Sequence, residues 1–244
     1  MPRGLSATWL LPCATHLLLL YAQPVASLSG HVHDVTGAPI SGAKVDLRSW
    51  GKPSQPQRTS TDHNGRYEFS NLPHGDYEIT LSCPGFHTLS VKPVSIRNGN
   101  PAAVPSVELD VGEPCSDRPR IESVHFLPDL SARGSIVGSV DVTTSARSAS
   151  IGRISQARVE LLCSPTRVCG TTQTGAWGYF RFSELNPDGY GIRVTHPGFY
   201  PIERFGYGAK SGVERTYGPI TLEPCSPGNC DPKRRRAKPL CISE

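Results

Sequence analysis

The stretch 59–86, TSTDHNGRYEFSNLPHGDYEITLSCPGF, occurs again at 172–199 as TQTGAWGYFRFSELNPDGYGIRVTHPGF. The two segments align without a gap, and 11 of their 28 positions are identical. The identities fall mostly on turn glycines and on alternating apolar residues, which specify a backbone and a core rather than chemistry. The repeat therefore predicts two copies of one β-module that displays or binds rather than reacts.

Outward from the repeat, the first module is expected at 28–115, a polar, proline-punctuated linker at 116–133 and the second module at 134–225. The linker contains a small apolar island at Val124 to Leu127. The 24 glycines and 23 prolines suit many short strands joined by tight turns. No stretch has a sustained 3.6-residue apolar period, so the predicted fold class is all-β.

Residues 1–27 have the features of a cleaved export signal. Arg3 supplies the positive charge, Trp9 to Tyr21 is mostly apolar, and Val25-Ala26-Ser27 is a small-residue cleavage site. The apolar run is too short to span a bilayer, and no other segment approaches about 20 apolar residues. The expected location is therefore secreted or periplasmic, with no transmembrane segment.

Of the eight cysteines, Cys13 lies in the signal and the others follow it. In an exported protein this density predicts disulfides, and the odd number leaves one thiol over. A Cys83–Cys115 bridge would fasten the last strand of the first module, and Cys163–Cys169 would close a hairpin. One further pair and a spare thiol would come from the C-terminal cysteines Cys225, Cys230 and Cys241. Zinc is the competing interpretation, but no paired C-x-x-C with a nearby histidine is present, so no metal site is expected.

The charge is unevenly distributed along the chain. Without the signal, 24 basic and 21 acidic residues remain, and the whole excess lies in the segment 231–244 with its Lys-Arg-Arg-Arg run. A neutral body disfavours a nucleic-acid-binding domain, in which basic residues cover a folded face. The tail, 226–244, is expected to be disordered, and weak contact with an anionic surface is the alternative.

The motif Gly30-x-Val-x-Asp-x-x-Gly-Ala-Pro-Ile-x-Gly-Ala-x-Val is followed by Thr61-x-x-x-Gly-x-Tyr-x-Phe-x-x-Leu-Pro-x-Gly-x-Tyr-x-Ile-x-Leu and by Pro84-Gly-Phe. This series resembles the carboxypeptidase regulatory-like domain. The second module resembles it from Ile154 onward. The resemblance implies two tandem transthyretin-like antiparallel β-sandwiches, a fold grouped with carbohydrate-binding-like domains, and specifies function only weakly.

The residues required by familiar enzymes are missing. No histidine is followed by x-x-Glu, and neither a Gly-x-Ser-x-Gly turn nor a phosphate-binding glycine loop is present. His31 and His33 share the outer face of the first predicted strand and could form half a metal site. A polar outer face on an edge strand is the favoured interpretation, because no third ligand can be placed. No cofactor is expected.

Exposed aromatic residues are the candidate ligand-binding site. Trp177 and Tyr179 occupy the tip of a hairpin in the second module, at positions where the first module has Asn64 and Arg66. The segment that follows the repeat adds Tyr200, Phe205 and Tyr207 in a glycine-rich context. Flat aromatic faces near Arg and Glu suit sugar stacking or contact with a protein. Packing of Trp177 against the linker or the first module is the structural alternative.

These patterns predict an exported, non-enzymatic binding protein whose partner is a glycan or a protein of the cell envelope. A pair of accessory domains that stabilises or presents a partner is the main alternative. A degenerate transthyretin-fold enzyme is the second.

Overall fold

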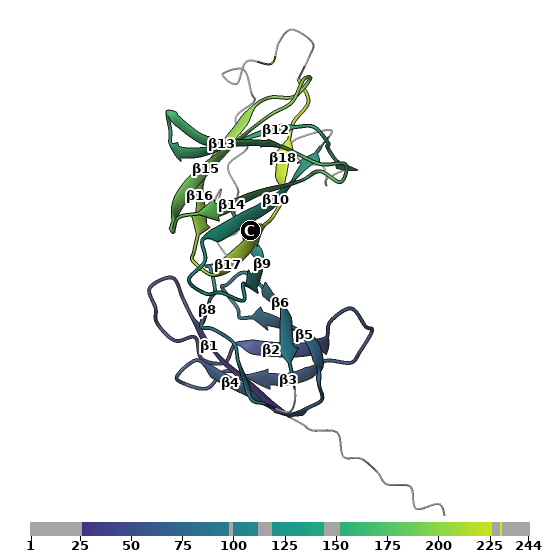
Figure 1. Cartoon of the computed structure of the whole chain (residues 1–244), viewed down its shortest axis with the longest axis vertical. Helices are drawn as coiled ribbons and strands as arrows, with labels where there is room; N and C mark the ends of the chain where they lie inside the picture. Colours follow the sequence, from purple (N-terminus) through teal and green to yellow (C-terminus); the bar gives the residue numbers. More distant parts are fainter. Residues whose placement is uncertain (1–25, 98–99, 112–118, 144–151, 226–229, 231–244) are drawn as a thin grey trace, which may run out of the picture.

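The computed structural model describes residues 26–97, 100–111, 119–143, 152–225 and 230. Nearly all of the predicted signal segment, Cys115, Cys241 and the basic run lie outside these residues. The described chain is all-β, as predicted, and Figure 1 shows two modules one above the other along the long axis.

The first module consists of two facing sheets. One has the order β4-β1-β7, with β8 also paired to β1, and the other has the order β3-β2-β5-β6. Its strands are β1 (Ala26–His33), β2 (Lys44–Ser49), β3 (Gln57–Ser60), β4 (Arg66–Leu72), β5 (Gly75–Ser82), β6 (Leu89–Ile96), β7 (Ala102–Ala103) and β8 (Val107–Glu108).

The second module repeats this pairing. The strand β10 pairs with β14, β17 and β18, as β1 does with β4, β7 and β8, and the opposite sheet is β13-β12-β15-β16. A short strand, β11 (Gly152–Arg153), also pairs with β10. The other strands are β10 (Gly134–Val142), β12 (Arg158–Ser164), β13 (Arg167–Gln173), β14 (Tyr179–Leu185), β15 (Asp188–Thr195), β16 (Ile202–Ala209), β17 (Val213–Tyr217) and β18 (Ile220–Leu222).

The two modules are joined by a strand within the expected linker. The strand β9 (Ile121–Phe126) pairs parallel with β6 of the first module and antiparallel with β17 of the second. One hydrogen-bonded sheet therefore runs through both modules, as the middle of Figure 1 shows. Val124 is buried in the first core, and Ile121 packs against both cores. The apolar island thus belongs to a strand that fastens the modules together.

Period-two burial builds each core. In β5 the buried side chains are Tyr77, Ile79 and Leu81, and the residues between them are more exposed. The strand β1 follows the same rule with Leu28 and Val32 buried. However, β1 is paired on both sides, so the expectation that it forms an edge strand is wrong. It pairs parallel with β7 and β8, which occupies the side that an edge strand would leave free.

A buried tyrosine hydroxyl in the first module offers a stability test. Tyr67 lies opposite Gly30, and its ring occupies the space of a side chain there. Its hydroxyl is buried without a hydrogen-bond partner, and burial raises its pKa. The second module has Phe180 opposite Gly138 in the same arrangement.

We expect Tyr67→Phe to leave the free energy of unfolding unchanged or to raise it by up to about 1 kcal/mol, because an unsatisfied buried hydroxyl is removed. Urea unfolding checks this. Tyr77→Phe is the matched control, since the Tyr77 hydroxyl donates to the Pro73 carbonyl at 2.8 Å. The control is expected to lose about 1 kcal/mol. A larger loss for Tyr67→Phe than for Tyr77→Phe would contradict the prediction.

Candidate functional site

The turn between β13 and β14 holds Trp177 away from the body of the second module. Thr174 fixes the base of the turn, since its hydroxyl donates to the Ile154 carbonyl at 2.8 Å and accepts from the Ala157 amide at 2.9 Å. The Gly178 amide donates to the Gly175 carbonyl at 2.9 Å and closes the turn. The Trp177 side chain is 79% exposed at its tip. A turn fixed by hydrogen bonds thus exposes a large apolar ring to solvent.

Tyr179 is 46% exposed and stands beside a cation. The Arg153 guanidinium carbon lies 4.3 Å from the centroid of the Tyr179 ring. The same guanidinium pairs with the buried carboxylate of Asp141, with 3.7 Å between Nε and Oδ1. Arg153 was not predicted, because it follows the Ser-rich stretch 143–152, for which the first module has no counterpart. It adds a hydrogen-bond donor to the aromatic pair.

The structure does not assemble the other predicted aromatic residues around Trp177. Tyr207 is only 1% exposed, and its ring centroid lies 5.0 Å from that of Tyr217. It is therefore a core residue, and its assignment to a ligand surface is wrong. The cause is a bulge at Gly206, which shifts the strand phase so that Tyr207 turns inward.

Tyr200 and Phe205 lie elsewhere on the second module. Tyr200 is half-buried, and its backbone amide donates to the Glu223 carbonyl at 2.9 Å. Phe205 is 44% exposed on β16, whereas Tyr179 begins β14 in the opposite sheet. Trp177, Tyr179 and Arg153 therefore make up the candidate site, named here the aromatic tip.

The histidine pair on β1 does not gather further ligands. His31 is exposed, and the half-buried His33 places Nδ1 at 2.9 Å from the Asp34 carbonyl oxygen. Within the described part of the chain, no group of three His, Cys, Asp or Glu side chains could hold a metal ion. In the same part, no helix has the length and hydrophobicity to cross a membrane.

Among the residues that the structure describes, two disulfides are present, and both lie in or after the second module. Cys163 and Cys169 join β12 to β13, and Cys225 is joined to Cys230. Cys83 is a free, half-buried thiol, so the predicted bridge from Cys83 to Cys115 is wrong for this structure. Cys83 lies in the turn after β5, where it packs against the first core. Disulfides persist mainly outside the cytoplasm.

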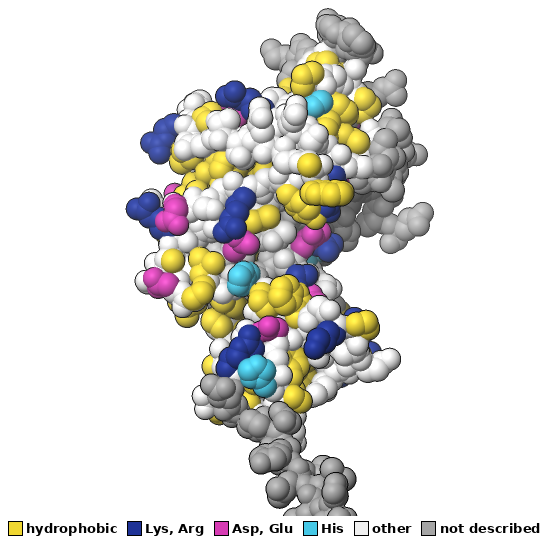
Figure 2. Space-filling model, turned by 45° about the vertical axis from the view of Figure 1, so that its right-hand side comes forward, with side chains coloured by type: hydrophobic (Ala, Val, Ile, Leu, Met, Phe, Trp, Pro, Cys, Tyr) yellow, Lys and Arg dark blue, Asp and Glu magenta, His cyan; other side chains and the backbone are white. Residues whose placement is uncertain are grey.

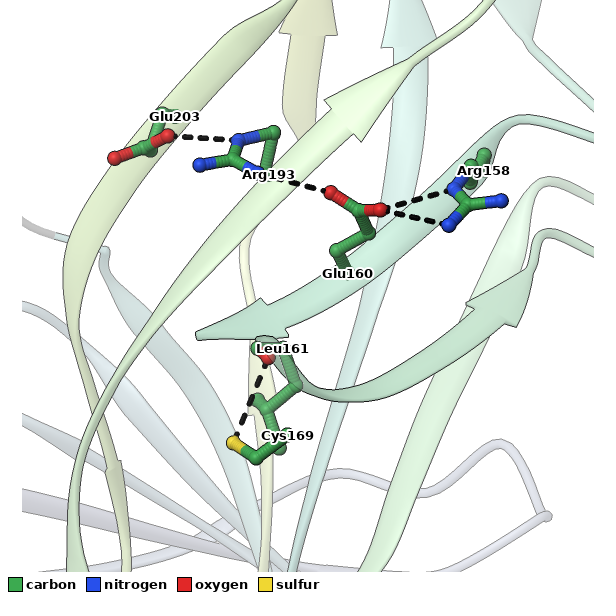
Figure 3. A network of polar contacts seen from close by, with 6 residues as sticks. All are labelled: Arg158, Glu160, Leu161, Cys169, Arg193 and Glu203. Atoms are coloured by element: carbon green, nitrogen blue, oxygen red, sulfur yellow. Dashed lines mark hydrogen bonds and ion pairs between the residues drawn. The ribbon is translucent and has the colours of Figure 1, made fainter. Parts of the chain in front are cut away.

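A charged ladder crosses the outer face of the second module. Figure 3 shows that Glu160 on β12 lies between Arg158 and Arg193, and that Arg193 also meets Glu203 on β16. The oxygen–nitrogen distances are 2.8 Å to Arg158 and 3.1 Å to Arg193. Each charge has a partner, so the ladder joins three strands and leaves little capacity for a ligand. On the face shown in Figure 2, basic and acidic side chains are likewise interspersed.

The ladder predicts a pH dependence of stability. The Arg158 guanidinium is the main cause that lowers the pKa of Glu160 below its ordinary 4.5, with Arg193 adding to it. A carboxyl group whose pKa is lower in the folded than in the unfolded chain stabilises the fold at pH values above the unfolded pKa. This stabilisation is lost as the pH falls through the folded pKa. We therefore expect the stability lost in Glu160→Gln to be smaller at about pH 3, below the unfolded pKa, than at pH 7.

Urea unfolding at both pH values measures this difference. The exposed Glu122, replaced by Gln, provides the control. An equal loss of unfolding free energy in Glu160→Gln at pH 7 and pH 3 would show that the charge of Glu160 does not contribute to stability.

Comparison with known proteins gives a family match for the first module. The family model of the carboxypeptidase regulatory-like domain matches residues 27–110. Residues 27–110 form a carboxypeptidase regulatory-like domain. The family match does not include the second module. The second module resembles the first through the internal repeat and through the same strand pairing.

Curated relatives are much longer proteins. Serine-aspartate repeat-containing protein F of Staphylococcus epidermidis is 28% identical over 161 residues, which are 66% of this chain and 9% of that protein. Serine-aspartate repeat-containing protein C of Staphylococcus aureus strain N315 is 28% identical over 161 residues, 65% of this chain and 16% of that protein. The chain thus spans less than a fifth of the length of these relatives.

Solved structures show weaker similarity. A minor pilin of Streptococcus agalactiae is 11% identical with a TM-score of 0.30, and the alignment covers 82% of this chain and 97% of the pilin. A 3-chlorocatechol 1,2-dioxygenase of Rhodococcus opacus is 13% identical with a TM-score of 0.31, over 46% of this chain and 73% of the enzyme. Scores this low support no inference about function.

Proposed function

We propose that this protein is a non-catalytic binding protein that acts outside the cytoplasm and contacts a glycan through the aromatic tip. The observation that carries the proposal is the 79% exposure of Trp177 on a turn whose base is fixed by hydrogen bonds. Contiguous exposed apolar surface indicates a binding site more strongly than a single exposed side chain does, and Trp177 is followed two residues later by the exposed Tyr179. An indole and a phenol ring beside a guanidinium offer the stacking faces and the donor that a sugar ring requires.

The experiment compares polysaccharide pull-down and glycan-array binding of the chain 28–244 with those of Trp177→Ala and Tyr179→Ala. Trp50→Ala is the matched control, because Trp50 is also exposed but lies in the first module. We expect both tip variants to lose binding, Trp50→Ala to retain it, and all three to unfold at the wild-type temperature.

Absence of glycan binding by the wild-type chain would refute the proposal that the ligand is a glycan and would leave a protein partner as the candidate. A lowered unfolding temperature of Trp177→Ala would instead show that the ring packs against the fold. In that case the aromatic tip would not be a binding site.

A spacer that presents a partner is the second candidate. The strand β9 favours it, because one sheet through both modules fixes their relative orientation. A spacer tolerates loss of the aromatic tip and requires β9, whereas a glycan binder requires the tip.

A further inference from the structure

A cavity lies between the modules, away from the aromatic tip. Its volume is about 370 Å³, within the size range of small-molecule sites. The first module contributes Glu108 and Asp110 to its walls, and the second contributes Phe205, Arg215 and Tyr217. We call it the inter-module cleft. A molecule bound there would touch both modules at once.

The charged groups of the inter-module cleft are not paired with one another. Within the described part of the chain, neither the Glu108 nor the Asp110 carboxylate has an ion pair or a side-chain hydrogen bond. The Arg215 guanidinium makes one long hydrogen bond, from Nη1 to the Gly208 carbonyl at 3.4 Å, and also interacts with the Tyr217 hydroxyl, while its buried Nε has no partner. Opposite charges therefore line one cavity without forming an ion pair with each other.

The remaining wall is shaped by an aromatic ring and by glycine. Phe205 exposes part of its ring, and Gly206 has a φ of +99°, a conformation that favours glycine. A Cβ at Gly208 would lie 3.0 Å from Nη1 of Arg215. The Tyr217 hydroxyl accepts from the Gly208 amide at 2.8 Å and donates to its carbonyl at 2.9 Å. Tyr217 thus holds the glycine segment in place, and Arg215 beside it has further N–H groups to donate to a ligand.

We propose that the inter-module cleft binds a zwitterion, an amino acid or a short peptide with free ends. Its ammonium group meets Glu108 and Asp110, and its carboxylate meets Arg215. Its apolar part lies against Phe205. A neutral sugar brings no charge to these groups, whereas a zwitterion pairs with the groups of both signs.

The experiment is calorimetric titration of the chain 28–244 with the dipeptide Gly-Phe at low ionic strength. N-acetyl-Gly-Phe lacks the ammonium group and Gly-Phe amide lacks the carboxylate, so each removes one half of the recognition. We expect Gly-Phe to bind and each blocked form to bind at least about tenfold more weakly. Glu108→Gln and Arg215→Gln are expected to weaken Gly-Phe binding similarly, and Glu68→Gln, an exposed carboxylate on β4, is the control.

Blocked dipeptides that bind as tightly as Gly-Phe would overturn the proposal, as would an absence of binding by all three. N-acetylglucosamine that binds in place of Gly-Phe would overturn it in favour of a sugar. If Arg215→Gln does not fold, the blocked dipeptides still decide the question on the wild-type chain. Trp177→Ala separates the two sites, because it is expected to lose glycan binding and to retain Gly-Phe binding.

Discussion

Val124→Asp is expected to make the two modules unfold separately. Val124 is 7% exposed on β9, packed in the first core, and its backbone pairs with Val91 of β6 and Arg215 of β17. A carboxylate at this position would be buried without a partner, at a cost of about 3 kcal/mol or more. Because β9 is the strand that links the two modules' sheets, its loss uncouples them.

Scanning calorimetry measures the effect. We expect one transition for the wild-type chain and two for Val124→Asp, and small-angle scattering should show a larger radius of gyration for the variant. Val35→Asp is the matched control, since the same change is made at a side chain that is 51% exposed. A single transition in Val124→Asp at the wild-type temperature would mean that β9 does not couple the modules.

Thr61→Val is expected to destabilise the first module by about 2–4 kcal/mol. The buried Thr61 hydroxyl donates to the Ile40 carbonyl at 2.6 Å and accepts from the Ala43 amide at 2.9 Å. Valine fills nearly the same volume, so the loss comes from two buried backbone groups left without partners rather than from a cavity.

The second module supplies a replicate of this experiment. Thr174 is the residue equivalent to Thr61 in the repeat and makes the same two hydrogen bonds, so Thr174→Val should lose a similar free energy. Thr59→Val, at a half-exposed position on the edge strand β3, is the control and should change stability little. Denaturant unfolding of the three variants is the measurement. Equal stabilities of Thr61→Val and Thr59→Val would contradict the assigned role of Thr61.

Much of the fold could be predicted from the repeat, because its identities lie where strands turn and where side chains enter the core. The identity of Thr61 and Thr174 in the repeat also has a structural reason, since their hydroxyls make equivalent hydrogen bonds in the two modules. The strand β9 could not be recognised in the same way. Its six residues are mostly only partly buried, and it is stabilised by partners on two different modules. Such pairing is not visible in a local pattern.

The candidate site was predictable only in part. The exposure of Trp177 follows from its place at a hairpin tip. Tyr207 shows where a prediction from alternating residues fails. The extra residue at Gly206 forms a bulge, so the residues after it point to the opposite face of the sheet from the one that alternation predicts. Arg153 and the inter-module cleft depend on segments that meet only in the folded chain.

The parallel pairing of β1 with β7 and β8 recurs in the second module as β10 with β17 and β18. The first and last strands of each module therefore lie side by side and point the same way. If the chain is pulled from its two ends, these strands are drawn past each other along their length, and their hydrogen bonds carry the load together rather than one after another. We therefore expect each module to resist mechanical extension.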